Sequence, residues 1–149
     1  MSEKSDLYAR IDECNRQINI INQDINSMSQ EKENVRGYLF DFNNQKDDVR
    51  DYDMTVGDTW RKQLCDQAIE IQRLIFQGIG SAAQMCENTM AELDRCISEA
   101  RRMIRELEST ISSCRARIAQ IEAEERAAAE RAAQEAREVE AYKASMGWT

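Results

Sequence analysis

The sequence contains no proline and only five glycines among its 149 residues. Proline and glycine are the main breakers of helices, so their scarcity favours long, uninterrupted helices. Aromatic residues make up only 6% of the chain, whereas charged residues make up 32%, which argues against a broad globular core. The composition therefore predicts an all-α protein that buries narrow seams between helices.

Histidine is absent, and with it the most common general base and metal ligand. The five cysteines have no Cys-x-x-Cys spacing, so we expect no metal site. The sequence also lacks a glycine-rich phosphate loop, and it has no serine or cysteine nucleophile with a plausible base. Its carboxylates fall on polar helix faces, where they serve solubility. We therefore expect no catalytic residue, no enzyme activity and no cofactor.

Basic residues are outnumbered by acidic ones, 20 against 28, which gives a net charge of −8. Such a chain gains nothing from nucleic-acid phosphates or anionic membrane surfaces, so neither is an expected partner. No apolar run approaches the roughly 18 residues of a membrane-spanning helix. The first residues also lack the basic and apolar regions of a Sec-type signal peptide. We expect a cytoplasmic protein without membrane insertion, which could be exported only by a Sec-independent route.

Apolar residues recur in alternating steps of four and three along residues 6–50, as in a helix packed in a coiled coil. They are Leu7, Ile11, Cys14, Ile18, Ile21, Ile25, Met28, Val35, Leu39, Phe42 and Val49. Lys32 and Lys46 occupy the two seam positions that this series leaves empty. Ser5 or Asp6 is expected to cap the start of this helix. Gly37, inside it, weakens the helix by about 1 kcal/mol relative to alanine.

Residues 51–59, "DYDMTVGDT", break the heptad pattern and are expected to form the turn. Asp58 or Thr59 would cap a second helix, which runs from Trp60 to residue 121. Its apolar stripe begins at Trp60 and continues through Leu64, Ala68, Ile71, Ile75, Ile79, Ala82, Cys86, Met90, Leu93, Ile97, Ala100, Ile104, Leu107, Ile111, Cys114, Ile118 and Ile121. Gly78 and Gly80 would allow a local kink.

Residues 122–149, here called the tail, are rich in alanine, glutamate and arginine. Pairs such as Glu122 and Arg126, four residues apart, support a helix that stands in solvent. The predicted organisation is thus a helical hairpin over residues 1–121, followed by a solvated helical tail.

Folding the two stripes about the turn gives an antiparallel two-helix coiled-coil hairpin. Counting outward from the turn places Val49 opposite Trp60 or Arg61, with Trp60 covering the closed end. The same count places Cys14 opposite Cys96 or Ile97, and Leu7 opposite Ile104. It predicts that mild oxidation links Cys14 to Cys96 within one chain.

In this register, the second helix is longer than the first and carries apolar residues without a partner in the chain. They are Leu107, Ile111, Cys114, Ile118 and Ile121. An exposed row of aliphatic side chains recruits a partner, because burying each contributes roughly 1.5 to 3 kcal/mol. We therefore expect this row to be the partner-binding surface. The alternative is a polar flank of the first helix, formed by Asn15, Asn19, Asn22 and Asn26.

The hairpin with Trp60 at its turn resembles the WXG-type proteins of Gram-positive type VII secretion. WXG proteins have a glycine two residues after the tryptophan, where this chain has Lys62. The export motif of that system, Tyr-x-x-x-Asp/Glu, usually follows the second helix, but the candidate there, "YKASM", ends in Met146. "YARID", from Tyr8 to Asp12 on the first helix, matches the motif and is the candidate export signal.

The length of the chain and its C-terminal helix are more similar to the YwqH-like, LXG-associated helical proteins. This resemblance covers roughly residues 5–121. It implies a targeting factor or chaperone that binds the helical N-terminal domain of an LXG-type toxin, together with a second small helical protein.

A different class of function explains the same seams. A self-assembling coiled-coil scaffold needs only the two stripes and the unpartnered row, and it would form a defined homo-oligomer. The mass of the purified protein alone distinguishes the scaffold from a factor that needs a partner.

Overall fold

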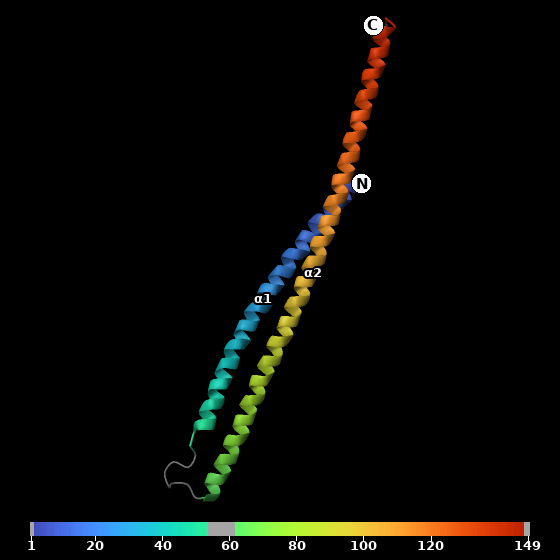
Figure 1. Ribbon diagram of the computed structural model, residues 1–149. Helices are drawn as coiled ribbons and strands as arrows, with labels where there is room; N and C mark the ends of the chain where they lie inside the picture. The colour runs from blue at the N-terminus through green and yellow to red at the C-terminus, as the bar shows by residue number, and fades with distance from the viewer. Residues whose placement is uncertain (1, 54–61, 148–149) are drawn as a thin grey trace. The chain divides into compact units, whose positions relative to one another are not determined.

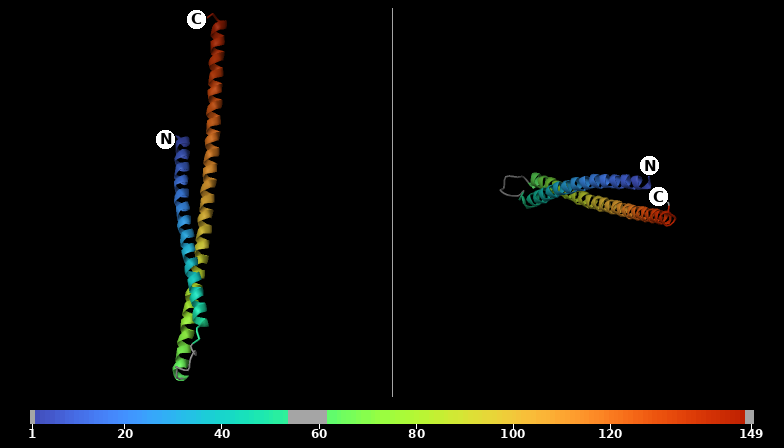
Figure 2. Two further views of the ribbon diagram at one scale, coloured as in Figure 1. Left: turned by 90° about the vertical axis from the view of Figure 1, so that its left-hand side faces the viewer. Right: turned by 90° about the horizontal axis from the view of Figure 1, so that it is seen from above.

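The computed structural model describes residues 2–53 and 62–147, which form two long helices. Helix α1 (Glu3–Asp51) has 49 residues and helix α2 (Lys62–Ser145) has 84. The two helices pack side by side in opposite directions (Figures 1 and 2). The predicted all-α, antiparallel two-helix hairpin with an extended second helix is therefore confirmed.

Helix α1 begins three residues earlier than the heptad pattern predicts. The Ser2 Oγ accepts a hydrogen bond of 3.0 Å from the backbone N–H of Ser5, as an N-cap side chain does. Ser2 is therefore the cap, and the prediction of Ser5 or Asp6 is wrong. Glu3 and Asp6 lie in the first turn, where negative charge is favourable next to the positive end of the helix dipole.

The ends of the helices next to the turn are only partly described. Helix α1 ends at Asp51, and Trp60 lies outside the described residues together with the predicted caps Asp58 and Thr59. At its other end, α2 stops at Ser145, and Gly147, two residues later, has φ of 74° and donates its N–H to the Ala144 carbonyl at 3.2 Å. Glycine adopts this left-handed conformation without steric cost, so it is well suited to end a helix.

Contacts divide the chain into two compact units. The terminal unit comprises Met1–Ile20 and Met103–Thr149, and the central unit comprises Ile21–Arg102. Each unit holds a segment of both helices, and α2 runs without a break through Gly78 and Gly80 and through residues 121 and 122.

The terminal unit contains a cluster of buried apolar side chains from both helices. Its members are Ile11, Cys14, Ile111, Cys114 and Ile118, with Leu7, Ile18 and Leu107 packed against them. At the end of this unit, Arg117 donates hydrogen bonds of 2.8 and 3.0 Å to the Glu3 carboxylate. The first helix therefore covers the second one well beyond Ile104, where the sequence count placed the limit of its reach.

In the central unit, both seam lysines have partners. The Lys32 Nζ lies 2.6 Å from the Asp94 carboxylate. The Lys46 Nζ lies 5.1 Å above the centre of the Phe76 ring, a cation–π contact, and its side chain packs next to Gly80. These contacts leave the lysines half-buried without an unpaired charge.

The predicted register between the helices is wrong by about two heptads. Cys14 packs in the cluster that contains Cys114, and not against Cys96, which is exposed. Next to the turn, the Gln72 side chain contacts the Val49 carbonyl, the position predicted for Trp60 or Arg61. The prediction assumed that pairing begins directly after the turn, whereas α2 has ten residues, 62–71, before it reaches Val49.

Candidate protein-binding surface

The central unit exposes a row of large apolar side chains at the start of α2. We call this row the α2 stripe; it consists of Leu64, Ile71, Leu74 and Ile75, each between 49% and 57% exposed. Their spacing of three, four and seven residues places them on one side of the helix. Three of them were predicted to lie in the buried seam, so the stripe is an apolar surface that the sequence count missed.

A shallow hollow lies next to the stripe, between the end of α1 and the start of α2. It is lined by Val49, Tyr52, Ile71, Gln72 and Ile75. The only amide side chain among them, Gln72, donates to the carbonyl oxygens of Val49 and Tyr52, the latter at 2.8 Å. These carbonyls belong to the end of α1, where backbone acceptors lack partners within the helix. Because the Gln72 amide is already hydrogen-bonded, the hollow presents mainly carbon atoms.

The end of the stripe lies in an uncharged part of α2, and the two charged side chains nearest to Ile71 and Leu74 in sequence pair with each other. Residues 74–86, "LIFQGIGSAAQMC", contain no charged side chain, although 32% of the whole chain is charged. Arg73 donates a hydrogen bond of 2.9 Å to Glu70 one turn earlier. This hydrogen bond is the main reason why the pKa of Glu70 is lowered, with the positive charge of Arg73 adding to it. An apolar helix face from another protein can therefore pack on Ile71, Leu74 and Ile75 without burying an unpaired charge of Glu70 or Arg73.

The exposed area of the chain is large for its mass. The chain exposes 11,225 Å², whereas about 7,800 Å² is typical of a folded monomer of 17.2 kDa. Large exposed apolar side chains are part of this area and suggest a surface for binding another protein.

The residues that the sequence analysis predicted to bind a partner are buried or half-buried in the terminal unit. Ile111, Cys114 and Ile118 are only 4% to 6% exposed, and Leu107 packs against them. Ile121, the last of the row, is half-buried. The prediction that this row has no partner within the chain is wrong, because α1 covers it.

The other candidate positions are on the surface. Tyr8 is 48% exposed, and its hydroxyl donates a hydrogen bond of 3.4 Å to Glu122 on α2. Asp12, one turn further along α1, is exposed. The four asparagines of the alternative flank are also exposed.

Within residues 2–53 and 62–147, no three histidine, cysteine or carboxylate side chains are grouped as a metal site would need. Neither described helix has a stretch long and apolar enough to cross a membrane.

Comparison with protein-family models, with curated proteins and with solved structures gave no match to this chain. The geometry of the exposed surface therefore carries the functional argument.

Proposed function

We propose that the protein is a non-catalytic helical adaptor that binds an amphipathic helix of another protein through the α2 stripe. The observation that carries this proposal is the exposure of four large aliphatic side chains on one side of a helix that has no charge between residues 74 and 86. Helices commonly recognise each other by laying an apolar face into an apolar groove, with anchors spaced three, four and seven residues apart.

The resemblance to LXG-associated helical proteins supplies the class of partner. In this proposal, the chain is a targeting factor or chaperone, and its partner is the helical N-terminal domain of an LXG-type toxin exported by type VII secretion. A second small helical protein can take part in the same complex. Tyr8 and Asp12 remain the candidate export signal, because both are accessible on the surface of α1.

Co-expression tests the proposal directly. The tagged full-length chain is produced with the N-terminal domain of an LXG toxin encoded beside it, and the complex is purified through the tag. In the double variant Ile71→Asp, Leu74→Asp, each carboxylate would lose its water in the interface, so we expect binding to weaken at least about 100-fold.

The matched control is Gln77→Asp, Gln84→Asp, which adds the same two charges at exposed positions of α2 that are outside the stripe. It should retain the toxin domain, and circular dichroism should show both double variants to be folded. A folded stripe variant that still captures the domain at the level of the unchanged protein would refute the proposal.

The scaffold reading makes a different prediction for the same variants. If the stripe served large-scale self-assembly, the stripe variant would lower the mass of the protein purified alone, and no toxin domain would be captured by any form.

A further inference from the structure

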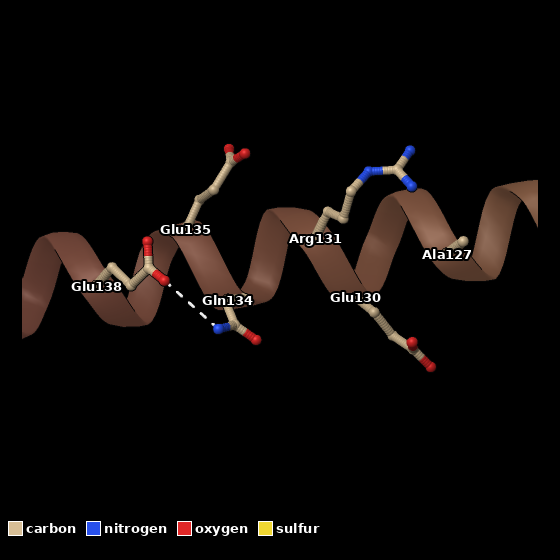
Figure 3. A pocket seen from close by; sticks show the side chains of 6 residues that line it. All are labelled: Ala127, Glu130, Arg131, Gln134, Glu135 and Glu138. Atoms are coloured by element: carbon tan, nitrogen blue, oxygen red, sulfur yellow. Dashed lines mark hydrogen bonds between the residues drawn. The ribbon is translucent and has the colours of Figure 1, made fainter.

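In its first turn, the tail lies next to α1, where the Lys4 Nζ is 3.7 Å from Glu122 and 3.6 Å from Glu125. Beyond that turn, the described part of the tail is a single helix with no described element beside it. It belongs to the terminal unit and extends α2 past the first residue of α1 (Figures 1 and 2). From residue 123 to residue 147, every side chain except Ala127 is exposed. Figure 3 shows Ala127 and five of the exposed side chains, and all six leave the same helix. Packing of an amphipathic face supplies most of the stability of helices in proteins, so a helical partner would stabilise the tail further.

The heptad pattern of the buried seam continues into the tail without a change of phase. We call the continued positions the tail face; they are Glu125, Ala128, Ala132, Glu135, Val139, Tyr142 and Met146. Their steps of three and four continue the series Cys114, Ile118 and Ile121 of the terminal unit, in which Cys114 and Ile118 are buried. Val139, Tyr142 and Met146 are between 51% and 59% exposed. Beyond its first turn, the tail thus has the heptad pattern of a coiled-coil helix, and α1 does not cover that part of it.

We propose that the tail face binds the tail face of a second copy of this chain in an antiparallel coiled coil. The twofold axis passes between residues 133 and 134. The layers of this coil pair Glu125 with Tyr142, Ala128 with Val139, and Ala132 with Glu135 of the other copy.

Two of these layers combine side chains that are complementary in size or in hydrogen bonding. A small side chain meets a larger one where Ala128 faces Val139. In the outermost layer, the Tyr142 hydroxyl can donate a hydrogen bond to the Glu125 carboxylate.

The charges that flank this face are complementary in the same alignment. In an antiparallel pair, the positions on one side of the seam meet the equivalent positions of the other helix. Arg131 of each copy then meets Glu138 of the other, and Lys143 meets Glu122. Glu122 and the seam residue Glu125 already lie 3.7 and 3.6 Å from Lys4 in their own chain, so Arg131 and Glu138 contribute most to the proposed pairing. Glu138 accepts one hydrogen bond, of 3.4 Å, from Gln134 (Figure 3).

Other alignments bring like charges together. A parallel pair places Glu125 against Glu125 and Glu135 against Glu135 within the seam, where like charges are costly. Sliding the antiparallel pair by one heptad places either Arg131 against Arg131 or Glu138 against Glu138. The antiparallel alignment about residues 133 and 134 places no like charges opposite each other in a layer or across the flanks.

Sedimentation equilibrium of the full-length chain over a wide range of concentration tests the proposal. We expect a monomer–dimer equilibrium. Arg131→Glu and Glu138→Arg should each weaken dimerisation about tenfold or more, because each change creates two like-charge contacts in the symmetric dimer. Mixing the two variants should restore association, since the mixed dimer has only opposite charges at these positions.

Arg137→Glu and Glu130→Arg are the matched controls. They make the same charge changes on the same helix but at positions that face away from the proposed seam, so they should dimerise as the unchanged chain does. Chains that stay monomeric at every concentration, or a mixture of the two seam variants that associates no better than each alone, would overturn the proposal.

The dimer is independent of the proposed adaptor function, because it uses the terminal unit whereas the α2 stripe lies in the central unit. Arg131→Glu should therefore leave toxin-domain capture unchanged. Likewise, the stripe variant Ile71→Asp, Leu74→Asp should leave dimerisation unchanged.

Discussion

At the scale of single residues, the register between the helices decides which cysteines can react. Cys14 and Cys114 are buried in the terminal unit, and Cys96 is exposed on α2. A thiol must reach solvent as the thiolate to react, so burial protects it until the structure opens. We predict that a thiol reagent modifies Cys96 well before Cys14 or Cys114 in the folded protein, as peptide mapping by mass spectrometry would show.

The same experiment under mild oxidation tests the register itself. A link between Cys14 and Cys96 should not form within one chain. Its appearance in good yield would mean that the helices pair as the sequence count suggested, about two heptads away from the register in the structure.

The contact between Glu3 and Arg117 predicts a specific dependence on pH. The hydrogen bonds from Arg117 lower the pKa of Glu3 below its ordinary value of 4.5, with the positive charge of Arg117 adding to the effect. A carboxyl group with a lowered pKa stabilises the fold above its unfolded-state pKa, and this contribution is lost as pH falls through the folded-state value. Glu3→Gln should therefore melt at a lower temperature than the unchanged protein at pH 7.

This difference should be small, because the pair is exposed, and added salt should reduce it. At pH values below the folded-state pKa of Glu3, the difference in melting temperature should disappear, because the Glu3 carboxyl group is then neutral in both the folded and the unfolded protein. Glu130→Gln, a change in the tail, should leave the melting temperature unaltered at both pH values. A difference for Glu3→Gln that persists in strong acid would show that the contribution of Glu3 is not electrostatic.

At the scale of elements, Gly37 lowers the stability of α1. A Cβ atom added there would have no neighbour within 4 Å, and the residue is exposed in the middle of the helix. Replacing glycine by alanine in such a position removes backbone freedom from the unfolded chain. We predict that Gly37→Ala raises the free energy of unfolding by about 0.5 to 1 kcal/mol, measured by urea denaturation. Lower stability would indicate that another part of the protein contacts this position.

The sequence predicts the two elements and their antiparallel packing well, because a heptad stripe defines both a helix and its buried side. It does not predict their register, since sliding one stripe past the other by seven residues leaves the apolar pattern unchanged. In the structure, particular polar contacts distinguish the registers, such as Lys32 with Asp94 and Arg117 with Glu3. A lysine in an apolar seam is the signal that the sequence did offer, because it needs an acid or an aromatic ring opposite it.

The register error also explains why the candidate site was misplaced. When α1 is moved along α2 to the register of the structure, it covers one end of the apolar seam of α2 and uncovers the other end. Ile111 and Ile118 gain cover, whereas Leu64, Ile71 and Ile75 lose it. The remaining member of the α2 stripe, Leu74, lies outside the heptad seam, and an apolar residue outside the seam in an uncharged run is the sequence feature that could have indicated this surface.

At the scale of the whole molecule, the large apolar side chains of α2 divide into a group that holds the fold together and a group that remains exposed. Ile118 is 5% exposed in the terminal cluster, and Leu74 is 54% exposed in the central unit. Both are aliphatic residues of the same helix, so replacing each by aspartate compares the two parts directly.

Ile118→Asp removes a buried side chain and forces a carboxylate into an apolar cluster. We predict that it lowers the free energy of unfolding by at least about 3 kcal/mol. Leu74→Asp should change it by less than about 1 kcal/mol, because an exposed carboxylate keeps its water. Urea denaturation followed by circular dichroism measures both changes. If Ile118→Asp proved harmless and Leu74→Asp unfolded the protein, the adaptor proposal would lose its basis, because the α2 stripe would then belong to the core.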